Sequence, residues 1–257
     1  MKIRIFIMLL LLALLTVPAL AQESTHSVTF DGFGFDFSDA LAQNVNIQQV
    51  PGDPIEGAGP GFSDAAKTQF TLYNSGQPMD SLFDTGGVRV YRMADLAQYD
   101  FLQAQVEQLQ TLVAERPDLS AYASGVFGEA GGLPYVPVLT HGQVAIARAE
   151  YVETEAVVGI RYMVVVRADL GPFTPRDFMY TFQGITTDGE YYIAATFLPT
   201  TTLFPEVTSV DPAVFQEQWP EYVAESIAVV NSAAPEAFTP SLDVLDAVVE
   251  SFRLEGM

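Results

Sequence analysis

The chain has no cysteine among its 257 residues and contains only two histidines, His26 and His141. Without cysteine it has no disulfides, no thiolate metal ligands and no site for a bacterial lipoprotein anchor. Two histidines are too few for the usual zinc sites, so no metal or other cofactor is predicted. The hydrophobic content of 49% and aromatic content of 12% are ample for a packed core, which must hold the chain together by itself.

Positive charge is also scarce, with 11 lysines and arginines against 32 acidic residues. Without Lys2 and Arg4, which belong to a predicted signal peptide, nine basic residues face 32 acidic ones, a net charge of −23. Such a surface repels phosphate, which argues against nucleic-acid binding and against anionic membrane surfaces. The acidity suits solubility outside the cell or cation binding, but no D-x-D-x-D-G calcium loop is present.

The N-terminus has the pattern of a secretory signal peptide. An apolar run from Ile5 to Leu15 follows the basic start, and Pro18 precedes the small-residue site at residues 19–21. We expect cleavage before Gln22. The run is shorter than the roughly 20 residues of a membrane-spanning helix, so no stable span is expected after cleavage. The predicted location is secreted or periplasmic.

Short strands dominate the first part of the mature chain. Residues Ser27 to Ser38 alternate apolar with small or polar side chains, and Asp31-Gly32 is expected to turn the chain between two short strands. Residues 51–61 are rich in glycine and proline and are predicted to form a loop. Two further strands are predicted from Thr68 to Gly76 and from Gly87 to Tyr91.

Three segments have helical patterns. Apolar residues recur every three or four positions from Leu96 to Val113, and Pro117 ends this pattern. Helices are also predicted from Asp211 to Ser232, where Asp211-Pro212 is a typical start, and from about Ser241 onwards. They are expected to cover a sheet.

Four consecutive strand-like runs lie between the first two helical segments: GQVAIARAEYVE, VGIRYMVVVRAD, DFMYTFQGI and EYYIAATFLP. Short turns, such as that at residues 187–189, require antiparallel neighbours. In the second run, Ile160 and Val164 share one face while Arg161 lies on the other. The order of elements predicts a single α+β domain over residues 22–257, with a mainly antiparallel sheet covered by amphipathic helices.

A resemblance accompanies this pattern. FGFDFSDALA, VRVYRMADL, GIRYMVVV, MYTFQGITTDGEYYIAATFLP and LDVLDAVVESFRLE together resemble a family of exported bacterial proteins of unknown function, over most of the mature chain. The block YTFQG-T-DG-YY (residues 180–192) is its most recognisable part. The late meander and the final helix running into residues 251–253 are similar to the PsbP-like α-β-α sandwich. That similarity implies a non-catalytic accessory or binding domain and transfers no catalytic residue.

The triplet Asp84-Thr85-Gly86 is the sharpest catalytic motif. Aspartic proteases present a catalytic aspartate in this way, but they need two carboxylates that share a proton. A second such triplet is absent, so a homodimer would have to complete the site. Alternatively, the aspartate caps a tight turn before a strand, in which glycines adopt positive φ. The turn is the favoured interpretation.

Paired carboxylates for glycoside hydrolysis offer another chemistry. Glu150, Glu153 and Glu155 flank one strand end, and Asp188 and Glu190 flank a turn. Acids at strand ends are also common as solvated loop residues, and such clusters arise by chance in so acidic a chain.

Aromatic residues suggest a binding surface instead. Tyr191 and Tyr192 are adjacent in a strand, so one of them points away from the core-facing side. With Tyr180 or Phe182 from the neighbouring strand they would form a platform for a sugar or peptide. An outer helix would bury the same residues equally well.

The function expected from the sequence is an exported, non-catalytic binding or accessory protein of the cell envelope or extracellular space. Its partner would be an unknown small molecule, glycan or protein. The alternative is a secreted hydrolase that acts through acidic residues.

Overall fold

Seven antiparallel strands form the central sheet, in the order β3-β4-β5-β9-β8-β7-β6. This computed structural model describes residues 24–76, 86–123, 131–206 and 210–255. The strands of the sheet are β3 (Asn44–Val50), β4 (Lys67–Tyr73), β5 (Gly86–Arg92), β6 (Gln143–Glu153), β7 (Val157–Val166), β8 (Met179–Thr186) and β9 (Tyr191–Phe197). Each neighbouring pair is antiparallel, as the short turns in the sequence predict.

Two meanders meet in the middle of this sheet. β3, β4 and β5 follow one another, and the chain returns from the far edge through β6, β7, β8 and β9 until β9 pairs with β5. Between β5 and β6 lie helices α1 (Met93–Leu96) and α2 (Asp100–Glu115) and the 3-10 helix η2 (Leu119–Tyr122). Because both halves of the chain contribute to one sheet, the fold is a single α+β arrangement, as predicted.

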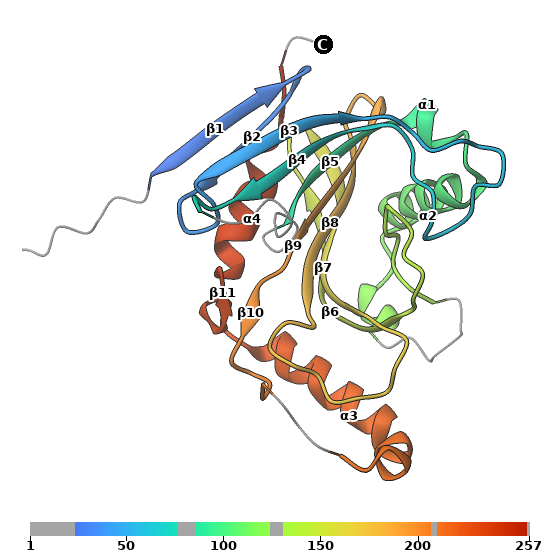
Figure 1. Ribbon diagram of the computed structural model, residues 1–257, viewed down its shortest axis with the longest axis vertical. Coiled ribbons are helices and arrows are strands. Elements are labelled where there is room, and N and C mark those ends of the chain that lie inside the picture. Colours follow the sequence, from blue (N-terminus) through green and yellow to red (C-terminus); the bar gives the residue numbers. More distant parts are fainter. Residues whose placement is uncertain (1–23, 77–85, 124–130, 207–209, 256–257) are drawn as a thin grey trace, which may run out of the picture.

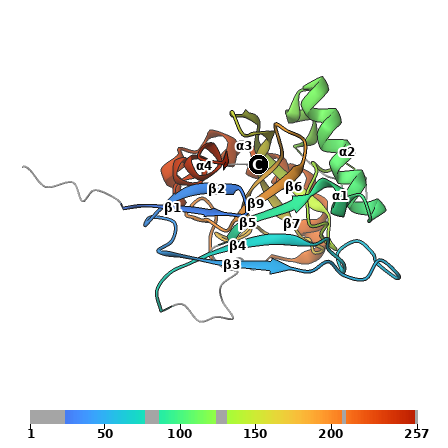
Figure 2. The same cartoon turned by 90° about the horizontal axis from the view of Figure 1, so that it is seen from above.

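A smaller sheet and two helices lie on the opposite face from α2 (Figures 1 and 2). The small sheet has the order β1-β2-β12, and helices α3 and α4 pack against β6 and β2 respectively. These elements are β1 (Thr25–Phe30), β2 (Phe33–Ser38), β12 (Arg253–Leu254), α3 (Pro212–Ser232) and α4 (Leu242–Glu250). Strands β10 (Thr200–Thr201) and β11 (Phe238–Thr239) pair as a two-stranded ribbon. The 3-10 helix η3 (Pro235–Ala237) directly precedes β11.

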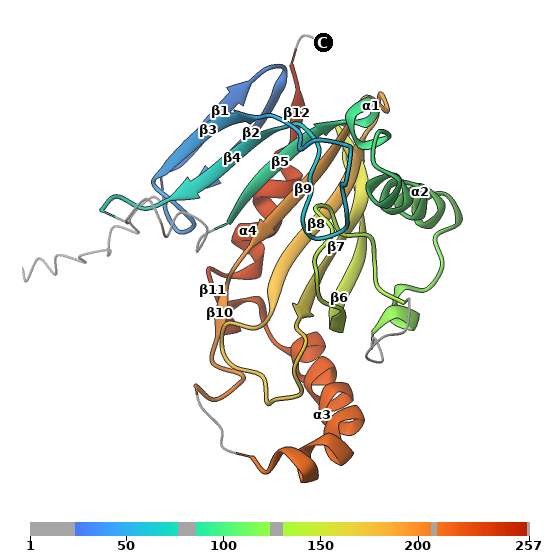
Figure 3. The same cartoon turned by 45° about the vertical axis from the view of Figure 1, so that its right-hand side comes forward.

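Alternation along the strands sorts apolar side chains into two cores, one on each face of the central sheet. In β7, Ile160 and Val164 belong to the core under α2, whereas Met163 belongs to the core under α4. Figure 3 shows the strands passing between these two helices. Arg161 pairs with Asp246 of α4 at 3.1 Å, so it lies on the α4 face. The face assignment predicted for this strand is confirmed.

Four glutamine side chains hold the irregular segment at residues 132–136 against the α2 face. Gln105 Oε1 accepts the N–H of Tyr135 at 3.0 Å, and Gln183 Oε1 accepts the N–H of Val136 at 2.9 Å. Gln143 bonds to both the N–H and the carbonyl oxygen of Leu133, and Gln108 donates its amide to the carbonyl oxygen of Gly132. Buried backbone groups without partners cost free energy, so these bonds make a buried loop possible and fix its position.

Three elements differ from the sequence expectation. β3 is a strand that the pattern does not predict, because its alternation is weak and its side chains are half-buried or exposed. The predicted helix from Leu96 is divided, since α1 ends at Leu96 and α2 starts at Asp100. After α4 the chain does not end as helix, because β12 pairs with β2.

Other expectations are confirmed. Asp31 and Gly32 form the turn between β1 and β2, with φ of 51° and 78°. Asp211 caps α3 by accepting the N–H of Ala213 at 2.9 Å. Within the described ranges, no helix has both the length and the apolar character needed to cross a bilayer. The predicted signal peptide and Asp84 lie outside these ranges.

Candidate functional site

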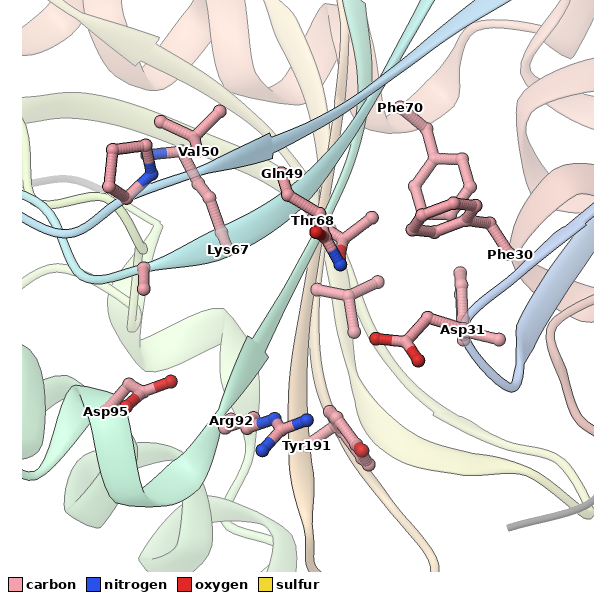
Figure 4. A pocket seen from close by; sticks show the side chains of 14 residues that line it. Phe30, Asp31, Gln49, Val50, Lys67, Thr68, Phe70, Arg92, Asp95 and Tyr191 are labelled. Carbon is pink, nitrogen blue, oxygen red and sulfur yellow. The ribbon is translucent and has the colours of Figure 1, made fainter.

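A pocket of about 350 Å³ lies between the β1–β2 turn and the central sheet. Strands β3, β4, β5 and β9 supply its floor, and the turn supplies one wall (Figure 4). Pockets for drug-sized ligands have volumes of about 300–1,000 Å³, so this space suits a ligand at the small end of that range.

Strand register brings the floor residues together. Gln49 of β3 is opposite Thr68 of β4, and Thr68 is opposite Val90 of β5. Two residues further along β5, Arg92 is opposite Tyr191 of β9. Because side chains at alternate positions share a face, Val90 and Arg92 both point toward the hairpin.

Aromatic packing fixes the wall formed by the hairpin. The Phe33 ring lies 5.9 Å from that of Phe70 and 5.3 Å from that of Phe252, so the start of β2 is anchored in the core. Asp31 has a φ of 51°, a conformation that aspartate and asparagine adopt more readily than most residues. The turn therefore holds the Asp31 side chain over the pocket.

Charges of both signs line the pocket. In Figure 4 the Asp31 carboxylate and the Arg92 guanidinium point into the space from different walls, and Tyr191 lies beside Arg92. Asp95 of α1 lines it on the other side of Arg92. The Lys67 ammonium is occupied elsewhere, because it bonds to Asp64 at 2.7 Å. Arg92 is therefore the lining cation that has no ion pair within the described part of the chain.

Most of the basic residues in the described structure have a bonding partner. Of the nine basic residues beyond the predicted signal peptide, six bond to carboxylates or helix carbonyls: Lys67, Arg116, Arg148, Arg161, Arg167 and Arg253. Arg89, Arg92 and Arg176 make no ion pair or hydrogen bond among the described residues. With 32 acids in the chain, an unpaired arginine in a pocket is open to an external anion.

The structure places the three candidate tyrosines differently. Tyr180 and Tyr192 are fully buried, on opposite faces of the sheet, so the exposed platform is not formed and the burial alternative holds for them. Tyr180 donates to Asp246 and Tyr192 to Gln183, and burial raises the pKa of both phenols well above 10.0. Phe182 is also buried. Only Tyr191 lines the pocket.

The candidate carboxylates do not converge in the described structure. Glu150 and Glu153 pair with Arg161 and Arg116 at exposed positions. Glu155 and Glu190 are exposed, the latter in the β8–β9 turn. Asp188 caps that turn, and the hydrogen bond from the Thr186 hydroxyl at 2.6 Å lowers the pKa of its carboxyl. This arrangement fits solvated turn residues.

The histidines and metal ligands add no further site. His26 lies 2.7 Å from Asp39 on the exposed hairpin, and His141 contacts Thr140. In the described ranges, no three residues of the kinds that bind metals are grouped closely enough to hold an ion.

No protein-family model matches the sequence, no curated protein shows significant similarity to it, and no solved structure matches its fold. The resemblance to an exported family and to the PsbP-like sandwich thus stays a prediction from the sequence.

Sequence reasoning did not select Asp31, Arg92 or Asp95. Asp31 is predicted there only as a turn residue. The sequence does contain one signal for Arg92: it directly follows the core of a predicted strand, in a chain with very few basic residues.

Proposed function

We propose that the protein is an exported, non-catalytic binding protein that holds a small zwitterionic molecule in the pocket between the β1–β2 turn and the sheet. The observation that carries this proposal is Arg92, an unpaired guanidinium, facing the same space as the Asp31 carboxylate. An anionic group of the ligand bonds to Arg92, and a cationic group bonds to Asp31. Export itself is proposed from the N-terminal sequence pattern.

Apolar surfaces in the pocket favour a ligand with an apolar body. Phe30, Phe33, Phe70 and Val90 line it beside the charged groups. Binding sites of this kind combine mostly apolar walls with a few polar groups that fix orientation. Amino acids and short peptides with an aromatic side chain have both features.

A matched ligand series tests the proposal with the mature chain. Phenylalanine and phenylalanine-containing di- and tripeptides provide different separations between the charged groups. Phenethylamine lacks the carboxylate, and 3-phenylpropionate lacks the amine. We expect calorimetry to detect the binding of at least one zwitterion and weaker binding of both truncated analogues by about tenfold or more, because each loses one charge-assisted hydrogen bond.

Two variants assign the contacts. Arg92→Gln should weaken binding of the zwitterion but leave the affinity for phenethylamine, which has no carboxylate, unchanged. Asp31→Asn should weaken binding of the zwitterion but leave the affinity for 3-phenylpropionate, which has no amine, unchanged. Asparagine tolerates the positive φ of Asp31, so the turn is kept. Arg176→Gln and Glu115→Gln make the same charge changes at exposed positions and serve as controls. The absence of binding throughout the series, or equal effects of the controls, would overturn the proposal.

The hydrolase alternative has a separate readout. Release of free amino acid from the dipeptides, or of sugar from a glycoside panel, would favour it over a binding role.

A further inference from the structure

A second hollow, of about 170 Å³, lies on the opposite face of the central sheet, over β4, β5 and β9. Its charged group is Arg89, three residues before Arg92 on β5 and therefore on the other face. The polar neighbours are Gln69, Tyr135 and Thr196, and the apolar ones include Pro137 and Leu139. This hollow is separate from the pocket beside the β1–β2 turn.

Arg89 is partly buried and has no hydrogen bond or ion pair with any described residue. Its neighbours across the sheet are Gln69 on β4 and Ala194 on β9, neither of which carries charge. Gln69 donates its amide to Thr71 at 3.2 Å instead. Withdrawing a guanidinium from water without a counter-charge is unfavourable, and an anionic ligand would supply that counter-charge.

The absence of a side chain at Gly87 helps to form the hollow. Gly87 lies between Thr71 and Thr196 in the next row of the sheet. A Cβ at this position would meet the Phe70 carbonyl oxygen at 2.0 Å, so the close approach of the strands requires glycine. Because Gly87 has no side chain, the surface of the sheet between Thr71 and Thr196 is left open beside Arg89.

Hydroxyl donors lie on the other side of the hollow. Tyr135 Oη and Thr196 Oγ1 are 3.3 Å apart, and burial raises the pKa of Tyr135, which keeps its hydroxyl protonated. Tyr135 is held in place because Gln105 binds its backbone N–H and Gln183 binds that of Val136. A wall fixed in this way loses little entropy when a ligand binds.

We propose that this hollow binds a small monocarboxylate, with the carboxylate on Arg89 and its short apolar tail against Pro137 and Leu139. Guanidinium and carboxylate form paired, parallel hydrogen bonds, and the hydroxyl of Tyr135 or Thr196 supplies a further donor. The size of the hollow limits the tail to a few carbons. The inference does not depend on the zwitterion site.

The test measures binding of acetate, propionate and butyrate to the mature chain by calorimetry, with chloride as the background anion. Affinity should increase by about fourfold with each added methylene while the tail is being buried. Arg89→Gln should weaken binding by about tenfold or more, because it removes the charge-assisted pair. Arg176→Gln makes the same change in net charge at an exposed position and should leave the affinity unchanged.

Two further variants keep the test decisive if Arg89→Gln does not fold. Arg89→Lys retains the charge but not the paired geometry, and should bind more weakly. Leu139 is 37% exposed, so Leu139→Glu should fold and should weaken binding by placing a like charge at the rim. Failure of the wild-type chain to bind any carboxylate overturns the proposal. So does an equal loss in Arg176→Gln, or binding of sulfate or phosphate alone.

Discussion

The side chain of Gln183 lies fully buried in the middle of the central sheet and bonds to three groups. Its Oε1 accepts hydrogen bonds from the N–H of Val136 at 2.9 Å and from the hydroxyl of Tyr192 at 2.8 Å. Its Nε2 donates to Thr181 Oγ1 at 2.9 Å. One residue thereby connects the sheet to the loop that carries Tyr135, which lines the hollow around Arg89.

We expect Gln183→Leu to lower the free energy of unfolding by about 3 kcal/mol, because two buried donors lose their acceptor. Urea unfolding followed by fluorescence measures this loss. Gln110→Leu, at an exposed position of α2, is the matched control and should change stability by less than about 0.5 kcal/mol. Equal stability of the two variants would show that the Gln183 network contributes little.

Single residues also show where sequence reasoning stops. The period of a strand separates Tyr191 from Tyr192, but it does not say what covers each face. Tyr192 is buried in the core under α2, and Tyr180 is buried in the core under α4. The choice between platform and burial depended on long-range packing, which the local pattern does not contain.

Among the elements, a bulge in β6 connects the edge of the sheet to helix α3. The register of β6 against β7 shifts between Ala147 and Glu150, and Arg148 has a φ of 53°. The Arg148 guanidinium donates to the carbonyl oxygens of Ala233 at 2.8 Å and Val230 at 3.3 Å. Carbonyls at the end of a helix have no partner within it, so Arg148 stabilises the C-terminus of α3.

Two substitutions separate the side chain of Arg148 from its backbone. Arg148→Ala should lower the free energy of unfolding by about 1–3 kcal/mol, because the carbonyls of α3 lose a charged donor. Arg148→Gly loses the same bonds, but it relieves a positive φ that costs other residues about 1–2 kcal/mol. The greater freedom of unfolded glycine offsets about 0.4–1 kcal/mol of that relief.

Arg148→Gly is therefore expected to be more stable than Arg148→Ala by about 0.5–1 kcal/mol. Urea unfolding of both variants under the same conditions measures the difference. A glycine variant less stable than the alanine variant would mean that the bulge relaxes to negative φ once the arginine is gone.

The elements that the sequence predicts well are those with strong local signals. The β8–β9 hairpin and the last turns of α2 have turn residues or proline at the expected places. β3 has Val45 and Ile47 only partly buried among asparagine and glutamine, so its pairing with β4 decides its structure. The break before α2 leaves the apolar periodicity intact, and a pattern based on spacing alone does not detect it.

At the scale of the whole molecule, the two proposed sites arise from connections between distant segments. Asp31 and Arg92 are on different sheets, and they meet because the β1–β2 turn packs over strands of the central sheet. Arg89 and Tyr135 line one hollow because the loop before β6 is bonded both to α2 and to the central sheet. The residue types are visible in the sequence, but their juxtaposition is not.

Two kinds of carboxylate determine how stability should depend on pH. Burial raises the pKa of Asp246 above 3.8, even though Tyr180 and Arg161 bond to it. Hydrogen bonds lower the pKa of four others below 3.8: Asp39, Asp118, Asp169 and Asp188. The first kind binds protons more tightly in the folded state, and the second kind binds them less tightly.

The free energy of unfolding should therefore rise as the pH falls through the raised folded pKa of Asp246 toward 3.8. It should fall again below 3.8, as the four hydrogen-bonded carboxylates take up protons at their lowered folded pKa values. Repulsion among the acidic residues adds to the rise, but about 1 M salt shortens its range to about 3 Å.

Urea unfolding from neutral pH to pH 3, repeated in high salt, measures both parts of this profile. In high salt, Asp246→Asn should remove the rise between neutral pH and the maximum, because asparagine does not titrate. The decline at lower pH should persist in this variant, since the other four carboxylates are unchanged. An undiminished rise in Asp246→Asn would assign it to groups other than this buried carboxylate.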